Sequence, residues 1–82
     1  MIERTVELTI PLDPNAVALL VQTATKFKSS IMLTQTDKKA NAKSIMGIIS
    51  LGLSAGQTVT IMAHGEDEVQ ALPAIEAFLR VK

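Results

Sequence analysis

Cysteine is absent from the chain and aromatic residues are scarce, and both absences exclude classes of function. Without a thiol the protein has no disulfide, no thiolate zinc site and no cysteine nucleophile. Phe27 and Phe78 are the only aromatic residues, so an enzyme built around an aromatic pocket is not expected. A small domain that folds without disulfides or a thiol-bound metal suits a reducing compartment, and we therefore expect a cytoplasmic protein.

Net charge and long hydrophobic runs are absent as well. Eight Lys+Arg residues balance eight Asp+Glu residues, so bulk attraction to nucleic acid is not expected. The N-terminus has a charged pair where a signal peptide would be apolar, which argues against export. The uncharged stretch 44–65 is interrupted by glycines and hydroxyl side chains. We therefore expect neither nucleic acid nor a membrane as a partner.

The hydrophobic pattern that is present predicts regular structure from the start of the chain. Residues 2–10 alternate between apolar and polar side chains, apart from Arg4, which is typical of a half-buried strand. Asp13 and Pro14 then suit the N-cap and the first position of a helix. The apolar face of that helix follows at helical spacing and ends with Phe27.

The rest of the chain predicts three more strands and two more helices. Acidic residues 66–68 suit a helix start because the helix dipole favours negative charge there. Pro73 has no amide to donate, so we expect it to kink or divide the last helix. The expected elements are strands from Ile31 to Gln35, from Lys39 to Ala42 and from Thr58 to Ala63, a short helix from Ser44 to near Gly52, and a helix after Gly65.

This order of elements predicts one small α+β domain over residues 1–82. A chain of 82 residues with 48% hydrophobic residues has room for a single core. Helices would cover one face of a four-stranded sheet. The other face would carry Glu3, Glu7, Thr58 and Thr60 towards solvent.

Catalytic and metal-binding chemistry finds little support. His64 is the only histidine, and it follows the last predicted strand with no partner that could orient it as a base. The acidic run 66–68 is explained as a helix start, so we expect no metal site. The protein is therefore predicted not to be an enzyme and to need no cofactor.

Ser44 is the hydroxyl of greatest interest. At a helix N-cap it lies where free amides and the helix dipole favour a phosphate, and Lys43 could meet the added charge. Ile45, Met46 and Ile49 are too many apolar residues for one buried face of a two-turn helix, which predicts an exposed contact patch. Five lysines form either a solvated face or a site for an acidic partner: Lys26, Lys28, Lys38, Lys39 and Lys43.

The segment around this serine carries a family resemblance. Asn41-Ala42-Lys43-Ser44-Ile45-Met46-Gly47, followed by Ser50-Leu51-Gly52, resembles the regulatory-serine region of HPr, the phosphocarrier family of the bacterial sugar phosphotransferase system. The similarity runs without gaps over essentially the whole chain. It implies an open-faced β-sandwich of four antiparallel strands and three helices.

The resemblance also implies a site and partners. Ser44 would be phosphorylated by the HPr kinase/phosphorylase, and Lys43, Ile45, Met46 and Ile49 would contact partner proteins. A LacI-type catabolite repressor is the second partner that the resemblance suggests. The protein would be a monomer or a weak dimer.

The chain departs from the family pattern where the active histidine is expected. Asp13 stands at the position of that histidine, and Asn15 stands at the position of the arginine that assists it. Histidine phosphocarriage is therefore not expected, and the chain is closest in logic to the catabolite-repression branch of the family. Asn15 cannot hold a phosphate as an arginine does, which weakens the case for a repressor complex. Two alternatives stay open: a carrier working at Asp13 or His64, and a module that binds a partner without phosphate.

Overall fold

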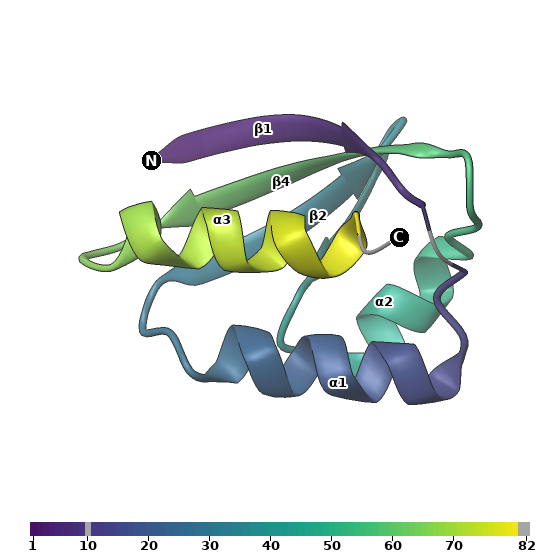
Figure 1. Cartoon of the computed structure of the whole chain (residues 1–82), viewed down its shortest axis with the longest axis horizontal. Helices are drawn as coiled ribbons and strands as arrows, with labels where there is room; N and C mark the ends of the chain where they lie inside the picture. The colour runs from purple at the N-terminus through teal and green to yellow at the C-terminus, as the bar shows by residue number, and fades with distance from the viewer. Residues whose placement is uncertain (10, 81–82) are drawn as a thin grey trace.

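Four antiparallel strands form one sheet, and three helices lie on one side of it (Figure 1). The structure is a computed structural model that describes residues 1–9 and 11–80. The α+β fold with one open sheet face is thereby confirmed. Within the part described, no helix has the length and apolar character needed to cross a bilayer. The elements are β1 (Ile2–Glu7), α1 (Pro14–Thr25), β2 (Ser30–Gln35), β3 (Lys38–Asn41), α2 (Ile45–Leu51), β4 (Thr58–His64) and α3 (Glu68–Leu79).

The strand order β1-β4-β2-β3 makes β4 and β2 central and leaves β1 and β3 at the edges. Directly opposed residues share a face, and Val6 with Val59 and Leu33 with Ile61 are buried pairs on the helix-covered face. The alternate positions face away from the helices. They include the four side chains expected there: Glu3, Glu7 and Thr58, which are exposed, and Thr60, which is half-buried.

β1 is shorter than the sequence alternation predicted. It ends at Glu7, because the pairing with the chain before β4 becomes irregular at Leu8, where the two bonds go to two different residues. The Leu8 amide donates to the Gln57 carbonyl at 2.8 Å, and the Leu8 carbonyl accepts from the Gly56 amide at 2.7 Å. Position 10, the end of the predicted strand, lies outside the described residues.

Arg4, the one charged residue at the apolar positions of β1, has a specific partner. It is paired with Ile61 across the sheet, so it stands on the helix-covered side. There its guanidinium donates to the Glu76 carboxylate of α3 at 2.8 Å. The ion pair allows a charge at this edge position of the covered face.

α1 ends earlier than its apolar pattern predicted. The helix runs to Thr25, and Phe27 follows it as a half-buried residue packed against the core. The Lys26 amide donates to the Thr23 carbonyl at 3.3 Å and the Phe27 amide to the Ala24 carbonyl at 3.2 Å. These shorter-range bonds close the last turn and end the helix.

Pro73 does not divide the last helix, so of the two outcomes expected from the sequence, division is wrong and a kink stays a prediction. α3 is continuous from Glu68 to Leu79 with Pro73 inside it (Figure 1). A residue at this position would normally bond to the Val69 carbonyl, and that bond is missing. Pro73 and Val69 are both exposed, so water can reach the carbonyl and the helix tolerates the loss.

Candidate functional site

Ser44 caps α2 as the sequence predicted. Its backbone is extended, its carbonyl accepts the first helical bond from Ile48 at 3.1 Å, and its hydroxyl accepts from the Gly47 amide at 3.1 Å. A Cβ added at Gly47 would lie 3.2 Å from the Ser44 hydroxyl. Because Gly47 has no Cβ, the space beside the half-buried Ser44 hydroxyl stays free.

The outer face of α2 is apolar and exposed. Ile45 is 44% exposed, Met46 74% and Ile49 47%, whereas Ile48 and Leu51 are buried against the sheet side. We call the three exposed residues the α2 patch. The expectation that this short helix keeps apolar side chains in solvent is confirmed, and their role in partner binding stays a prediction.

Leu19 is a further exposed apolar residue that the sequence reasoning missed. It lies on α1, the helix that packs against α2, and is 54% exposed. Its neighbour Leu20 is fully buried. The available signal was that Leu19 falls outside the helical stripe of Val17, Leu20 and Ala24.

Lys43 is engaged elsewhere than at the serine. Its amide donates to the Asn41 side-chain carbonyl at 2.8 Å, and its ammonium donates to the Phe27 carbonyl at 2.8 Å. The side chain thereby joins the start of α2 to the segment after α1. A contact between Lys43 and a phosphate on Ser44 stays a prediction, and it would require the ammonium to leave Phe27.

Asp13 and Pro14 begin α1 as expected. The Asp13 carboxylate accepts from the Ala16 amide at 2.8 Å, and Pro14 is the first helical residue. Asn15 follows in the first turn, and both Asp13 and Asn15 are exposed. His64 is exposed at the end of β4, beside the start of α3 and at the opposite end of the molecule from the start of α1 (Figure 1).

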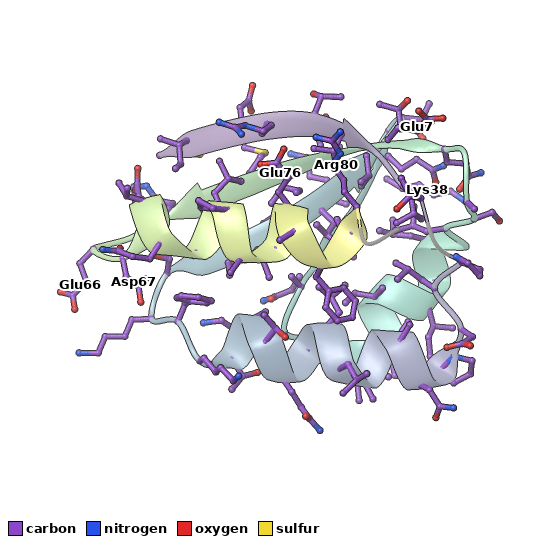
Figure 2. The ribbon with its side chains drawn as sticks, viewed as in Figure 1. Glu7, Lys38, Glu66, Asp67, Glu76 and Arg80 are labelled. Carbon is purple, nitrogen blue, oxygen red and sulfur yellow. The ribbon has the colours of Figure 1, made fainter. Side chains whose placement is uncertain are left out.

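The acidic run lies at the start of α3 as predicted, with Glu68 in the first turn, but the carboxylates also bond to groups outside the helix. Asp67 occupies the N-cap position, but its carboxylate bonds to no amide of α3. It accepts instead from the Lys28 amide at 2.8 Å, the Ser29 amide at 2.9 Å and the Ser29 hydroxyl. Figure 2 shows Asp67 pointing towards the segment between α1 and β2. The Ser29 hydroxyl and the Lys28 amide lower the pKa of Asp67.

Glu68 and Glu66 bind nearby groups. Glu68 accepts from the Gly65 amide at 3.0 Å and lies 3.2 Å from the ammonium of Met1. These two groups, the amide first, lower the pKa of Glu68. Glu66 pairs with Lys28 at 3.4 Å, but both side chains are largely exposed, so this pair adds little stability.

Comparison with known proteins gives a consistent result. The model of the family described as "PTS HPr component phosphorylation site" matches residues 2–80. The HPr-like protein Crh of Bacillus subtilis is 43% identical over 82 residues, covering 98% of this chain and 96% of that protein.

Solved structures agree. A phosphocarrier protein HPr from Bacillus anthracis superposes with a TM-score of 0.93 at 36% identity, covering 96% of each chain. Crystalline Bacillus subtilis Crh, described as a swapped, intertwined dimer, gives a TM-score of 0.81 at 44% identity, covering 98% of this chain and 94% of that one.

Proposed function

This chain belongs to the HPr family of the phosphotransferase system, and from that premise we propose that it is a regulatory member phosphorylated on Ser44 by the HPr kinase/phosphorylase. It would act in carbon catabolite repression through protein contacts. It would neither catalyse a reaction nor carry phosphate on a histidine.

The observation that carries the proposal is the position of Ser44 directly before the α2 patch. A phosphate there would add close to two negative charges at the start of α2, next to exposed Ile45 and Met46. A partner that buries the patch would therefore meet the phosphate in the same contact. Apolar area supplies affinity, and the charge makes that affinity depend on phosphorylation.

The residues at the start of α1 support the loss of histidine phosphocarriage. Asp13 offers a carboxylate where an imidazole would be needed, and one of its oxygens already caps the helix. Asn15 lacks the guanidinium that would bind a phosphate in two places. His64 lies at the other end of the molecule (Figure 1).

Two parallel reactions test the proposal. The protein is incubated with HPr kinase and ATP, and separately with enzyme I and phosphoenolpyruvate, and any phosphate is located by mass spectrometry. We expect one phosphate on Ser44 in the first reaction and none in the second. Ser44→Ala should abolish labelling, whereas Ser50→Ala, at an exposed serine within α2, should not.

The two alternatives predict other outcomes of the same experiment. Label from enzyme I that disappears in Asp13→Asn would indicate an acyl-phosphate carrier, and label that disappears in His64→Ala would indicate a histidine carrier. No labelling by an active kinase would leave a module that binds without phosphate.

The α2 patch can be tested with a matched pair of variants. Met46→Asp places a charge on the patch, and Val69→Asp places the same charge on α3 at a similarly exposed apolar residue. With the phosphorylated protein, Met46→Asp should weaken binding to the kinase and to a LacI-type repressor at least about tenfold. Val69→Asp should leave both affinities unchanged.

Asn15 supplies a test of repressor binding by gain of function. If the missing guanidinium limits the contact with phosphorylated partner surfaces, Asn15→Arg should tighten the complex of the phosphorylated protein with the repressor. Asn15→Gln, which is longer but neutral, should not. Equal affinities for the three proteins would show that the arginine position plays no part in this complex.

A further inference from the structure

The sheet face that no helix covers has an uneven distribution of charge. On β1 the residues of this face are Glu3 and Glu7, with Thr5 between them. On β3, at the opposite edge, Lys39 pairs with Thr34 and so lies on the same face. One edge of the open face is therefore acidic and the other basic. Figure 2 shows Glu7 at the end of β1, pointing away from the helices.

These charges do not neutralise each other within one molecule. Three strand spacings separate β1 from β3, which is about 14 Å. Among the described residues, no ion pair or hydrogen bond engages the side chains of Glu3, Glu7 or Lys39. The two edges are thus available to a partner with the reverse distribution of charge.

The centre of the face is uncharged. Met62 of β4 stands opposite Met32 of β2, and Thr60 stands opposite Thr34. The hydroxyls of Thr5 and Thr60 are hydrogen-bonded at 3.0 Å, whereas the Thr34 hydroxyl is buried without a partner in the described chain. A partner surface would meet no buried charge here.

A second copy of the chain has the required distribution of charge. Rotation by 180° about an axis parallel to the strands keeps the height along each strand and reverses the strand order. β1 of each copy then faces β3 of the other copy. Lys39 of one copy therefore lies opposite Thr5 of the other, between Glu3 and Glu7 of that copy. Met62 of one copy faces Met32 of the other, and Thr60 faces Thr34. Such a contact is isologous and closes at two copies.

We infer that the open sheet face is a self-association surface, on which two copies pack face to face with the acidic edge of each against the basic edge of the other. Aligned packing of two sheets is a common arrangement, with the sheets about 10 Å apart. Four strands of four to seven residues offer only a small area, below that of a stable interface. The dimer is therefore weak and forms at high local concentration. It leaves the α2 patch, on the helical side, uncovered.

Charge exchange tests the inference. The wild type, Glu7→Lys, Lys39→Glu and the triple variant Glu3→Lys/Glu7→Lys/Lys39→Glu are compared by sedimentation velocity between about 0.05 and 2 mM, a range suited to weak association. Each single variant should dimerise at least about fivefold more weakly, because two attractive contacts become repulsive. The triple variant reverses every charge of the two edges, so opposite charges again face each other across the interface, and it should return towards the wild-type dissociation constant.

Two controls separate this surface from other routes to a dimer. Glu66→Lys changes the net charge as Glu7→Lys does but lies at the start of α3, and it should leave association unchanged. Raising the salt from 20 to 500 mM should weaken the wild-type dimer. Concentration-dependent amide shifts in NMR spectra should map to Thr5, Thr34 and Thr60.

Three results would overturn the inference. One is a protein that stays monomeric over the whole concentration range. Another is a dimer that neither the charge variants nor salt affects, as exchange of an edge strand between copies would produce. The third is a triple variant that associates no better than the single ones.

Discussion

At the scale of single residues, Gly65 and Asp67 join the last helix to the segment between α1 and β2. Gly65 has φ of 151°, and a Cβ there would lie 2.7 Å from the Ser29 Cα. Asp67 accepts three hydrogen bonds from Lys28 and Ser29. The close approach of the two backbones and the carboxylate bonds depend on each other, because the carboxylate reaches both amides only at this distance.

Gly65→Ala should therefore destabilise the protein more than an alanine at another positive-φ glycine. The clash is with backbone, which cannot rotate away, and we expect a loss of at least about 2 kcal/mol. Gly52→Ala, at the end of α2 with φ of 62° and no atom within 4 Å of its Cβ, should cost only about 1 kcal/mol. Urea unfolding measures both. Equal losses would show that Ser29 moves aside.

The pKa of Asp67 predicts a contribution to acid unfolding. It is lowered from the ordinary value of 3.8, chiefly by the Ser29 hydroxyl, so the folded state binds its proton less readily than the unfolded state. The stabilisation is present above the unfolded pKa and is lost as the pH falls through the folded one. The Asp67→Asn variant should be less stable than the wild type at pH 7. Below about pH 4 its stability should fall by less than that of the wild type, because the variant has no carboxylate to protonate at this position. Urea midpoints from pH 7 to 2 measure this.

The matched control for Asp67 is the neighbouring carboxylate. Glu66 is largely exposed and pairs only with the exposed Lys28, so Glu66→Gln should reproduce the wild-type pH profile. If Asp67→Asn and the wild type lose stability in parallel below pH 4, the hydrogen bonds to Ser29 and Lys28 do not control the titration.

At the scale of elements, the ends of the helices are set mainly by local side chains. Asp13 and Ser44 each accept from an amide three residues ahead, and Gly52 ends α2 in the left-handed conformation. α3 differs, because the Asp67 side chain bonds to another segment and the helix contains Pro73. Replacement of the cap of α1 or α2 should therefore affect mainly that helix. The start of α3, in contrast, depends on contacts with the segment between α1 and β2.

Asp13 should act as a cap and not as a mimic of phosphohistidine. Asp13→Ala should lower the free energy of unfolding by about 1 kcal/mol, and Asp13→Ser, an uncharged cap, should nearly restore it. Neither change should alter affinity for kinase or repressor in a calorimetric titration. If Asp13→Ser is stable but no longer binds a partner, the carboxylate charge itself is recognised.

Pro73→Ala should stabilise α3. The change supplies an amide for the Val69 carbonyl and removes a residue with a poor helix propensity, for a gain of about 1–3 kcal/mol. Gln70→Ala, at an exposed position one turn earlier, should change stability by only a few tenths of a kcal/mol. Thermal and urea unfolding give the comparison. A destabilised Pro73→Ala variant would mean that the proline ring makes a favourable contact of its own.

At the scale of the whole molecule, the strand order decides how the protein opens. β4 is bonded on both sides, to β1 and β2, and carries the buried residues Val59, Ile61 and Ala63. α2 is seven residues long and leaves its outer face in solvent. We therefore expect β4 to resist opening more strongly than α2, although the two elements are neighbours in the sequence.

Native-state hydrogen exchange should show this difference. Amides of β4 should exchange only through global unfolding, whereas those of α2 should exchange through local opening with a smaller free energy. Local opening of α2 would also give a kinase access to the Ser44 hydroxyl. After phosphorylation, the negative charge stabilises the start of α2, so amide exchange in this helix should become slower. Protection in α2 equal to that in β4 would exclude such opening.

The sequence by itself determined the elements and the candidate serine. Alternation in β1, helical spacing in α1 and the caps Asp13 and Ser44 are local, since the interacting groups lie within four residues. The exposure of the α2 patch followed from too many apolar residues on a short helix. The sequence left open whether Pro73 would kink or divide its helix, and it did not reveal that Leu19 is exposed. Solvent access to one carbonyl or one side chain does not follow from the hydrophobic pattern.

Only the tertiary structure decided which distant groups meet. Asp67 reaches Ser29 across 38 positions of the chain, and Arg4 reaches Glu76 across 72. The same packing takes Lys43 to Phe27 and sets Glu7 and Lys39 on opposite edges of one sheet face. The physical reason is that local patterns specify strands and helices but not strand order. That order results from burying all the apolar faces together, and it determines every contact between distant side chains.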